Sequence, residues 1–444
     1  MEKQRKVLIL AHDFPPYVSV GGLRPYSWMK YLPVYDIHPV IVTRNWNDEQ
    51  TDPNSFIRAS TIQTVEQLNE EGHTLIKTPF RPNFAHRLLL KKGPSHYRIL
   101  RQFYSLMMEL LQFFLPVGTK RPIYCAAKDY LKTHKVDMII ATGEPFVLFH
   151  YAKKLSAEFG VPWIADYRDP WCEDMRIQHN LFLPTIYRAI EKRTVKTARA
   201  ITTVSEFLVS QLTDIHGPIK TKIITNGFDE ENFENLSSID ESQKLKIGFN
   251  GTIFPWYPIL SLLKTLNKLW KDHAINFELN LTGISHQDEI ASMIKNDFSS
   301  ITEFVHFSPA IENKIFVREM SKNNILILFN SFELMGTKIY DYLAMNRKIL
   351  LLYTDDDDAN KLKQTFYPTA LTGEFSNSLQ ADLLKKTNSG IAVKDADQLL
   401  NVLIQLNEEL LTTGEIAHTP SAIEEYSRKN QAKKLADFIK TNIA

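Results

Sequence analysis

The sequence predicts an α/β protein made of two successive doubly wound, Rossmann-like domains. Its 444 residues exceed the roughly 100–200 residues of a typical domain. Short apolar runs alternate with longer amphipathic segments, which is the pattern of strand–helix units in a parallel sheet. A polar stretch over residues 229–243 interrupts this alternation, and the pattern then restarts. We therefore predict an N-terminal domain of residues 1–226 and a C-terminal domain of residues 227–425.

In the first domain, short apolar runs next to turn residues predict buried strands. These strands cover residues 6–10, 38–43, 136–142, 162–166, 200–204 and 222–225. The helices that follow cover residues 24–32, 146–159, 185–198 and 207–213. Residues 13–22 are expected to form a loop, and Ser205 is expected to be the N-cap of the last of these helices.

The second domain repeats the same alternation after the polar stretch. Its predicted strands cover residues 244–250, 276–282, 304–307, 324–329, 347–353 and 390–393. Its predicted helices cover residues 258–270, 337–344 and 397–411, and a long amphipathic helix over 421–439 ends the chain.

Composition excludes several classes of protein. Hydrophobic residues make up 44% and charged residues 23%, which is ordinary globular composition rather than that of a disordered chain. The net charge is +1, which argues against a nucleic-acid coat protein, so we expect no nucleic-acid partner. The two cysteines, Cys125 and Cys172, are too few for a disulfide framework or a four-cysteine zinc site. No apolar run suits a signal peptide or approaches the ~18 residues of a spanning helix, so we expect a cytoplasmic protein.

Parallel sheets bind ligands beyond the carboxyl ends of their strands, so the loops after the strands are the candidate sites. Gly21 and Gly22 allow the backbone to approach a ligand, and Arg24 in the next helix adds a cation for an anion. An ordinary flexible loop is the alternative. Arg168 and Asp169 follow another strand, where charges are costly to bury unless they are paired or exposed to a ligand. An internal ion pair of Arg168 is the alternative there.

The most informative segment covers residues 333–341 and opens a helix. Gly336 and Thr337 lie in a first turn whose free amides bind anions, and Lys338 adds a cation for a phosphate. A solvated lysine is the alternative. Asp341 follows one turn later, where its carboxylate can accept hydrogen bonds from a ribose diol, or simply face the helix dipole.

Further candidates flank other strands. Gly251 and Thr252 form a turn that permits close approach by a phosphate or sugar, or a simple strand-to-helix turn. Glu144 follows a predicted strand and His150 lies on the next predicted helix, so both are candidate site residues, although a satisfied half-buried histidine is the alternative for His150. The four acids at positions 355–358 are interpreted as a solvated loop or N-cap, so we expect no metal site.

Charge is uneven in residues 77–135, which hold twelve basic residues but only two acidic ones, Glu109 and Asp129. Aromatic and aliphatic residues are interspersed among them. This mixture predicts contact with an anionic membrane surface, at which the protein is peripheral, or with a polyanionic or lipid-pyrophosphate acceptor. A cationic solvated face over an apolar helical core is the alternative.

In this order and spacing, seven segments resemble a family 4-type glycosyltransferase with the GT-B fold, of the kind that makes bacterial cell-surface polysaccharides. The segments are residues 14–22, 161–171, 202–205, 224–229, 249–252, 333–341 and 426–430. The resemblance implies two facing Rossmann-like domains with a cleft between them, and a last helix, within 426–444, that crosses back to the first domain. It also implies a nucleotide-sugar donor held by the second domain, a glycan or lipid-linked acceptor, and no cofactor. Transfer would be retaining and metal-independent.

The resemblance also suggests roles for residues. The family has two glutamates separated by seven residues, and Glu333 matches the first, so it is expected to contact the donor sugar. Asp341 stands at the second position and is expected to bind the ribose. Residues 253–257 lack the Arg and Lys that the family often has there, so Lys338 and the amides of residues 336–338 are expected to bind the diphosphate.

The remaining positions divide between the two substrates. Asn226 is expected on the donor side, together with Gly251, Thr252, Gly336, Thr337 and Asp341. The resemblance places Gly21, Gly22, Arg24, Glu144 and His150 on the acceptor side. The expected catalytic residues are Glu333, Lys338, Arg168 and Asp169, and the last two would also shape the acceptor side. Two alternatives remain open, a sugar-nucleotide epimerase on the same fold and a non-catalytic scaffold that binds a sugar nucleotide. A nicotinamide dehydrogenase is disfavoured because the sequence lacks the GxGxxG fingerprint.

Overall fold

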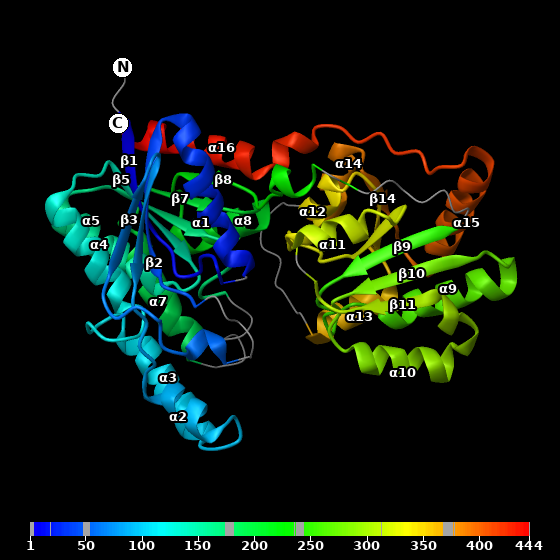
Figure 1. Ribbon diagram of the computed structural model, residues 1–444, viewed down its shortest axis with the longest axis horizontal. Helices are drawn as coiled ribbons and strands as arrows, with labels where there is room; N and C mark the ends of the chain where they lie inside the picture. Colours follow the sequence, from blue (N-terminus) through cyan, green and yellow to red (C-terminus); the bar gives the residue numbers. More distant parts are fainter. Residues whose placement is uncertain are drawn as a thin grey trace. The chain divides into compact units, whose positions relative to one another are not determined.

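The computed structural model describes residues 4–17, 19–47, 54–173, 182–234, 236, 244–311, 313–366, 376 and 378–443. The chain divides into two compact units, residues 1–226 with 428–444 and residues 227–427. Each unit has a mainly parallel sheet with helices on both faces (Figure 1). The predicted α/β class is thus confirmed.

The sheet of the first unit has the strand order β3-β4-β2-β1-β5-β6-β7-β8. All neighbours pair in parallel except β3, which pairs antiparallel with β4 at the edge. The strands are β1 (Arg5–Leu10), β2 (Ile37–Arg44), β3 (Glu66–Glu70), β4 (His73–Thr78), β5 (Met138–Gly143), β6 (Trp163–Tyr167), β7 (Ala200–Thr203) and β8 (Thr221–Ile223).

Helices cover both faces of this sheet, and for that reason its central strands have continuous apolar sequences. Val7 and Ile9 of β1 belong to one core cluster with Trp28 of α1 and Leu435 of α16. The alternate residues of β1 belong to a second cluster, which includes side chains of α4, α5 and α7. The helices are α1 (Val20–Tyr31), α2 (Phe84–Lys92), α3 (Arg98–Leu111), α4 (Arg121–Thr133), α5 (Val147–Phe159), α7 (Leu183–Val195), α8 (Glu206–His216) and α16 (Arg428–Ile443).

The sheet of the second unit is parallel throughout, with the order β11-β10-β9-β12-β13-β14. Its strands are β9 (Leu245–Asn250), β10 (Phe277–Thr282), β11 (Val305–Ser308), β12 (Ile325–Phe329), β13 (Lys348–Leu352) and β14 (Gly390–Ala392). Its helices are α9 (Ile259–His273), α10 (Gln287–Asp297), α11 (Asn313–Met320), α12 (Lys338–Ala344), α13 (Asp357–Phe366), α14 (Leu379–Thr387) and α15 (Ala396–Thr413). Helices α9, α10 and α15 share one core cluster, and α11, α12 and α14 share the other.

In each sheet the strand order reverses near the middle. In the first unit the reversal lies between β1 and β5, and in the second between β9 and β12. At such a reversal, the loops that follow the two neighbouring strands lead to opposite faces of the sheet. They leave a crevice at the carboxyl ends of the two strands, and α/β proteins bind ligands there. The loops after these four strands are therefore the places to examine for a site.

Two predicted element boundaries are wrong. Gly21 and Gly22 belong to the first turn of α1 rather than to a loop, because Ser19 caps the helix by accepting a hydrogen bond from the Gly22 amide. The predicted helix over 421–439 is interrupted at Ser427, whose buried, extended backbone forms a bridge with Phe228. Helix α16 starts only after that bridge.

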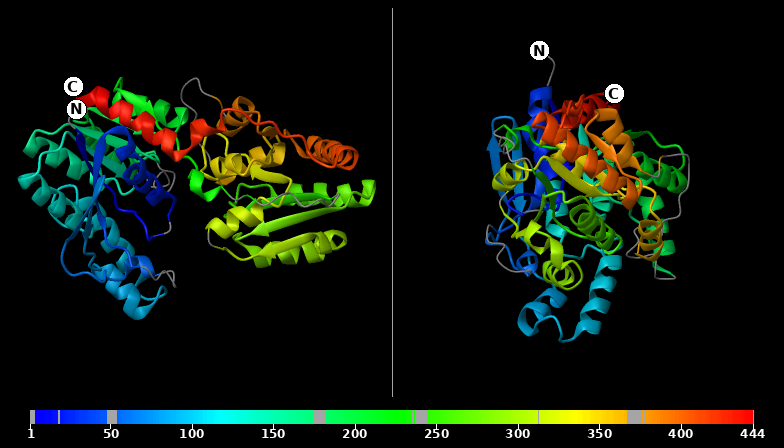
Figure 2. Two further views of the ribbon diagram at one scale, coloured as in Figure 1. Left: turned by 45° about the horizontal axis from the view of Figure 1, so that its top comes forward. Right: turned by 90° about the vertical axis from the view of Figure 1, so that its right-hand side faces the viewer.

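Helices α2 and α3 form a hairpin that extends from the rest of the first unit (Figures 1 and 2). No residue of α3 is buried, although the helix is rich in leucine, methionine and phenylalanine. Within the described part of the chain, no helix combines the length and the apolar character needed to cross a membrane.

Candidate functional site

At the carboxyl end of β1, a polar cluster forms around Asp13. Its carboxylate accepts hydrogen bonds from His12 Nδ1 and Ser19 Oγ, each at 2.9 Å. Burial acts to raise the pKa of Asp13, but the two hydrogen bonds and the nearby charges of His12 and Arg168 outweigh it, so this pKa is lowered. His12 and Asp13 were not among the predicted site residues, although a polar pair directly after a buried strand is the signal that marked other loops.

Arg168 fixes the turn that follows β5. Its guanidinium donates hydrogen bonds to the carbonyl oxygens of Gly143, at 2.6 Å, and Glu144, at 2.9 Å. A side chain at Gly21 would collide with this guanidinium. A side chain at Gly22 would crowd the Phe14 backbone, at 3.1 Å from its nitrogen. The missing side chains at Gly21 and Gly22 therefore make room for the Arg168 guanidinium and the Phe14 backbone, rather than for a ligand as predicted.

The prediction that Arg24 binds an anionic ligand is wrong. Its guanidinium is 3% exposed and forms an ion pair with Asp166, with 2.7 Å between Nη2 and Oδ1. It also donates hydrogen bonds to the carbonyl oxygens of Ile224 and Thr225. Thr202 donates a further hydrogen bond to the same carboxylate. Because a buried charge needs such partners, Arg24 serves to join α1, β6 and the segment after β8.

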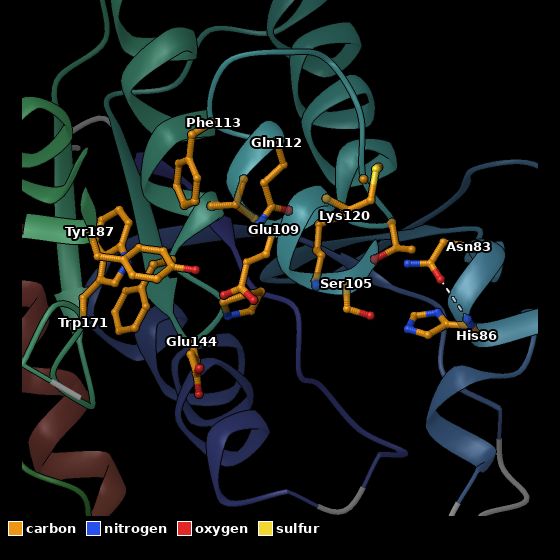
Figure 3. A pocket seen from close by; sticks show the side chains of 16 residues that line it. Asn83, His86, Ser105, Glu109, Gln112, Phe113, Lys120, Glu144, Trp171 and Tyr187 are labelled. Atoms are coloured by element: carbon orange, nitrogen blue, oxygen red, sulfur yellow. Dashed lines mark hydrogen bonds between the residues drawn. The ribbon is translucent and has the colours of Figure 1, made fainter. Parts of the chain in front are cut away.

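A pocket of about 400 Å³ lies beside this region, within the first unit (Figure 3). Glu144 lines it, together with residues of α2, α3, α7 and the segment before α4. His150 does not line the pocket, but lies edge-on to Phe113, which does. Burial lowers the pKa of His150 to about 4, so the ring is neutral at pH 7. Of the residues predicted for the acceptor side, only Glu144 lines the pocket, and Asp169 is exposed in the loop after β6.

In the second unit, the loops after β9 and β12 bring Gly251 and Lys338 together. A side chain at Gly251, whose φ is +78°, would lie 3.5 Å from Lys338 Nζ. The ammonium lies 4.3 Å from the centre of the Phe249 ring. Burial lowers the pKa of Lys338 to about 8, and among the described residues it has no carboxylate partner. Such a half-buried cation beside a glycine turn suits a phosphate.

The residues around Lys338 differ in their exposure. Gly336 and Thr252 are exposed, and Thr337 is the half-exposed N-cap residue of α12. Asp341 is half-exposed in the first turn of that helix. Asn226, also predicted for the donor side, is the last residue of the first unit before the chain enters the second.

Glu333 is placed differently from the prediction. Its side chain is fully buried, and its carboxylate pairs with the Lys363 ammonium of α13 at 2.7 Å. Lys363 also lies over the Phe332 ring, 4.4 Å from its centre. A buried carboxylate requires a cation, and Lys363 supplies it, so the acid is not presented to a ligand here. Nowhere in the described ranges do three His, Cys, Asp or Glu side chains gather as a metal site.

Comparisons with known proteins agree with the predicted family. Residues 59–232 match the model of Glycosyltransferase Family 4. The prediction of a family 4-type glycosyltransferase is confirmed by this match. No curated protein matches the chain.

Solved structures confirm the predicted GT-B fold over the whole chain. Sucrose-phosphate synthase from Thermosynechococcus elongatus is 13% identical with a TM-score of 0.54, over 99% of this chain and 96% of that one. HepE of Anabaena, in complex with UDP and glucose, is 13% identical with a TM-score of 0.52, over 98% and 100%. A UDP-forming α,α-trehalose-phosphate synthase from Burkholderia xenovorans, in complex with glucose 6-phosphate, is 10% identical with a TM-score of 0.58, over 99% and 100%.

We predict that removing the charge of Arg24 destabilises the first unit. Arg24→Met leaves the Asp166 carboxylate buried without a cation, which costs about 3–5 kcal/mol of unfolding free energy. Denaturant unfolding, followed by tryptophan fluorescence, measures it. The control is Arg5→Met, because Arg5 pairs with Asp137 at 3.5 Å and is half-exposed, so its loss costs below about 1 kcal/mol. Equal effects of the two substitutions would contradict the structural role of Arg24.

Proposed function

We propose that this chain transfers a sugar from a uridine diphosphate sugar to a hydroxyl of a glycan or lipid-linked acceptor. The observation that carries the proposal is the Lys338 ammonium beside Gly251, at the strand-order reversal of the second sheet. UDP as the nucleotide is inferred from the structural neighbours described with UDP, such as HepE. The family 4 match supports the reaction class.

The proposed reaction proceeds with retention and without a metal ion. The bond between the anomeric carbon and the phosphate oxygen breaks, and negative charge grows on the leaving diphosphate. Lys338 and the amides of residues 336–338 stabilise that charge, which is the main source of rate enhancement in such reactions. The acceptor oxygen bonds to the anomeric carbon on the face that the phosphate leaves, and its proton passes to the departing phosphate oxygen. The mechanism therefore requires no separate protein base.

Two residues of the acidic pattern receive different roles. We assign the ribose to Asp341, which is half-exposed in the first turn of α12. Glu333 is buried against Lys363, so we assign it to holding residues 332–334 against α13 rather than to sugar contact. Among the described residues around Lys338, no acid–base pair supports an epimerase on the same fold. A non-catalytic scaffold would bind the donor without turnover.

We predict that Asp341→Ala weakens UDP binding, measured by calorimetry, by about 1–3 kcal/mol through loss of hydrogen bonds to a charged group. Lys322→Met, at an exposed lysine paired with Glu319, is the control and leaves affinity unchanged. Addition of EDTA also leaves the affinity unchanged. Tighter binding of GDP, ADP or NAD would overturn the choice of uridine, and unaltered UDP affinity in Asp341→Ala would overturn the ribose contact.

We predict that UDP affinity falls as pH rises through about 8. Burial lowers the pKa of Lys338 to about 8, so the ammonium that attracts the diphosphate loses its proton there. The terminal phosphate of UDP is already fully ionised in this range, so the change reports on the protein. Lys338→Met binds UDP about tenfold more weakly at pH 7, as expected for the loss of a charge-assisted hydrogen bond, and its affinity no longer changes around pH 8. An identical pH profile in the variant would exclude Lys338 from the site.

The α2–α3 hairpin is proposed to bind an anionic membrane surface. Ile99 is 83% exposed and Phe103 66% exposed on α3, although monomeric proteins rarely expose contiguous apolar patches. Lys91 and Lys92, in the last turn of α2, are exposed as well. Apolar side chains next to lysines are typical of helices that lie at the interface of anionic lipids. This contact would bring the enzyme to a lipid-linked acceptor.

We predict that the double substitution Ile99→Ser and Phe103→Ser abolishes cosedimentation with phosphatidylglycerol vesicles. Lys91→Glu with Lys92→Glu weakens it too, since each lysine contributes about 1 kcal/mol near such a surface. Leu411→Ser, at an apolar residue of α15 that is 52% exposed, is the control and leaves binding intact. Binding to pure phosphatidylcholine is expected to be weak. Equal cosedimentation of all variants would exclude the hairpin as the contact.

A further inference from the structure

Two stacked aromatic rings follow β9 in the second unit, and the reaction proposed above does not use them. The rings of Phe254 and Trp256, here called the aromatic pair, lie 4.6 Å apart between centroids, with 4° between their planes. Phe254 is 39% exposed, and Trp256 is half-exposed. Apolar area that remains in contact with water costs free energy, which a ligand with an apolar face would recover by covering it.

The loop that carries the aromatic pair is fixed to the sheet at two points. The Ser285 hydroxyl accepts a hydrogen bond from the Ile253 amide at 2.9 Å and donates one to the Ile253 carbonyl oxygen at 3.2 Å. The Tyr257 ring stacks on Phe329, the last residue of β12, at 4.9 Å, and Phe254 packs edge-on against Tyr257 at 5.3 Å. The pair is therefore held in place before a ligand binds, which lowers the entropic cost of binding.

The aromatic pair lies next to the proposed diphosphate site. Phe254 follows Gly251 by three positions, and the Lys338 ammonium extends from α12 to that glycine. The Tyr342 hydroxyl of α12 donates a hydrogen bond to Asn250 Oδ1 at 2.8 Å, so the end of β9 is fixed to the same helix. Three residues span at most about 11 Å. A group bonded to the diphosphate can therefore contact the pair.

The linear order of a nucleotide sugar decides which group meets the rings. The ribose and base are bonded to one end of the diphosphate, and the sugar is bonded to the other. The ribose is assigned above to Asp341, which follows Lys338 by three residues and lies on the same side of α12. With the diphosphate between Lys338 and Gly251, the sugar, rather than the base, is directed to the loop after β9.

The charged contacts expected for the donor from the sequence are not offered at this end. The Glu333 carboxylate is buried and pairs with Lys363 at 2.7 Å. Residues 253–257 contain no Arg or Lys. The aromatic pair stands there instead, and the electron-rich face of such a ring attracts the weakly positive C–H groups of a pyranose. Contact with the transferred sugar is therefore mainly apolar on this side.

We propose that Phe254, supported by Trp256, stacks on the sugar ring of the donor and thereby helps to determine which sugar is transferred. The proposal rests on the function proposed above and names a specificity residue for its donor. A sugar whose C–H groups form a continuous face fits the aromatic pair, whatever polar groups its opposite face carries.

Calorimetry with UDP, UDP-glucose, UDP-galactose and UDP-N-acetylglucosamine tests the proposal. We expect Phe254→Ala to weaken the UDP-sugar that binds most tightly by about tenfold and to leave the affinity for UDP unchanged, because only the sugar loses its aromatic contact. Phe254→Tyr keeps an aromatic face and retains the affinity of the unaltered protein. Leu260→Ala, at an apolar residue of α9 that is 42% exposed, is the control and changes neither affinity.

Saturation-transfer NMR on the same UDP-sugar gives a second readout. The sugar-ring protons are expected to receive less saturation, relative to the uracil protons, in Phe254→Ala than in Phe254→Tyr. Unchanged binding of UDP shows that each variant is folded.

Two outcomes would overturn the proposal while the variants are folded. Equal weakening of UDP and the UDP-sugar would place the aromatic pair on the nucleotide, and unaltered affinity of Phe254→Ala for the UDP-sugar would exclude the contact. If the unaltered protein binds UDP but none of the UDP-sugars, this proposal fails alone. If it does not bind UDP, the function proposed above fails first.

Discussion

Parallel pairing of the central strands is the constraint on which both candidate sites depend. In the first unit β1 pairs with β2 and β5, and in the second β9 pairs with β10 and β12. The strand order therefore reverses at β1–β5 and at β9–β12, and loops from distant parts of the sequence meet there. Gly251 and Lys338 are 87 positions apart, yet the second reversal brings the Lys338 ammonium to the turn at Gly251. Gly251 has a positive φ, which glycine adopts more readily than other residues.

The presence or absence of an ion-pair partner distinguishes charged residues that stabilise the fold from those that are candidates for ligand binding. Arg24 with Asp166, and Glu333 with Lys363, are buried pairs in which each charge meets its partner at 2.7 Å. Such pairs stabilise the fold only while both members remain, so substitution of one member is costly. Lys338 and Lys120 have depressed pKa values and no carboxylate partner within the described ranges. A cation held in this way is ready for a ligand.

The sequence could predict the fold because the strands of both sheets are buried on two faces. Their continuous apolar runs, such as residues 7–10 and 325–329, are visible without a structure. The edge strand β3 was missed because all five of its residues are exposed and polar apart from Leu68. The interruption at Ser427 was missed because it depends on a bridge to Phe228, 199 positions earlier, which no local pattern encodes.

Site residues were harder to predict, since residue type shows neither burial nor partners. Arg24 and Glu333 have the chemistry of ligand-binding groups, and only the structure shows Asp166 and Lys363 beside them. Lys338 was found because it starts a helix directly after a glycine and a threonine. Lys120 was not predicted as a site residue because it is one of twelve basic residues in 77–135, and the sequence alone does not distinguish a lysine that lines a pocket from an exposed one.

Helix α3 has two sides with different surroundings. Ser105, Glu109 and Gln112 line the pocket and are spaced four and three residues apart, so they share one side of the helix. Ile99 and Phe103 are offset from them by about a third of a turn and are exposed. One side of α3 thus borders the pocket, and the other carries the apolar residues proposed above to contact lipid. On this argument, substitutions at Ile99 and Phe103 impair transfer to a lipid-linked acceptor and spare transfer to the free sugar.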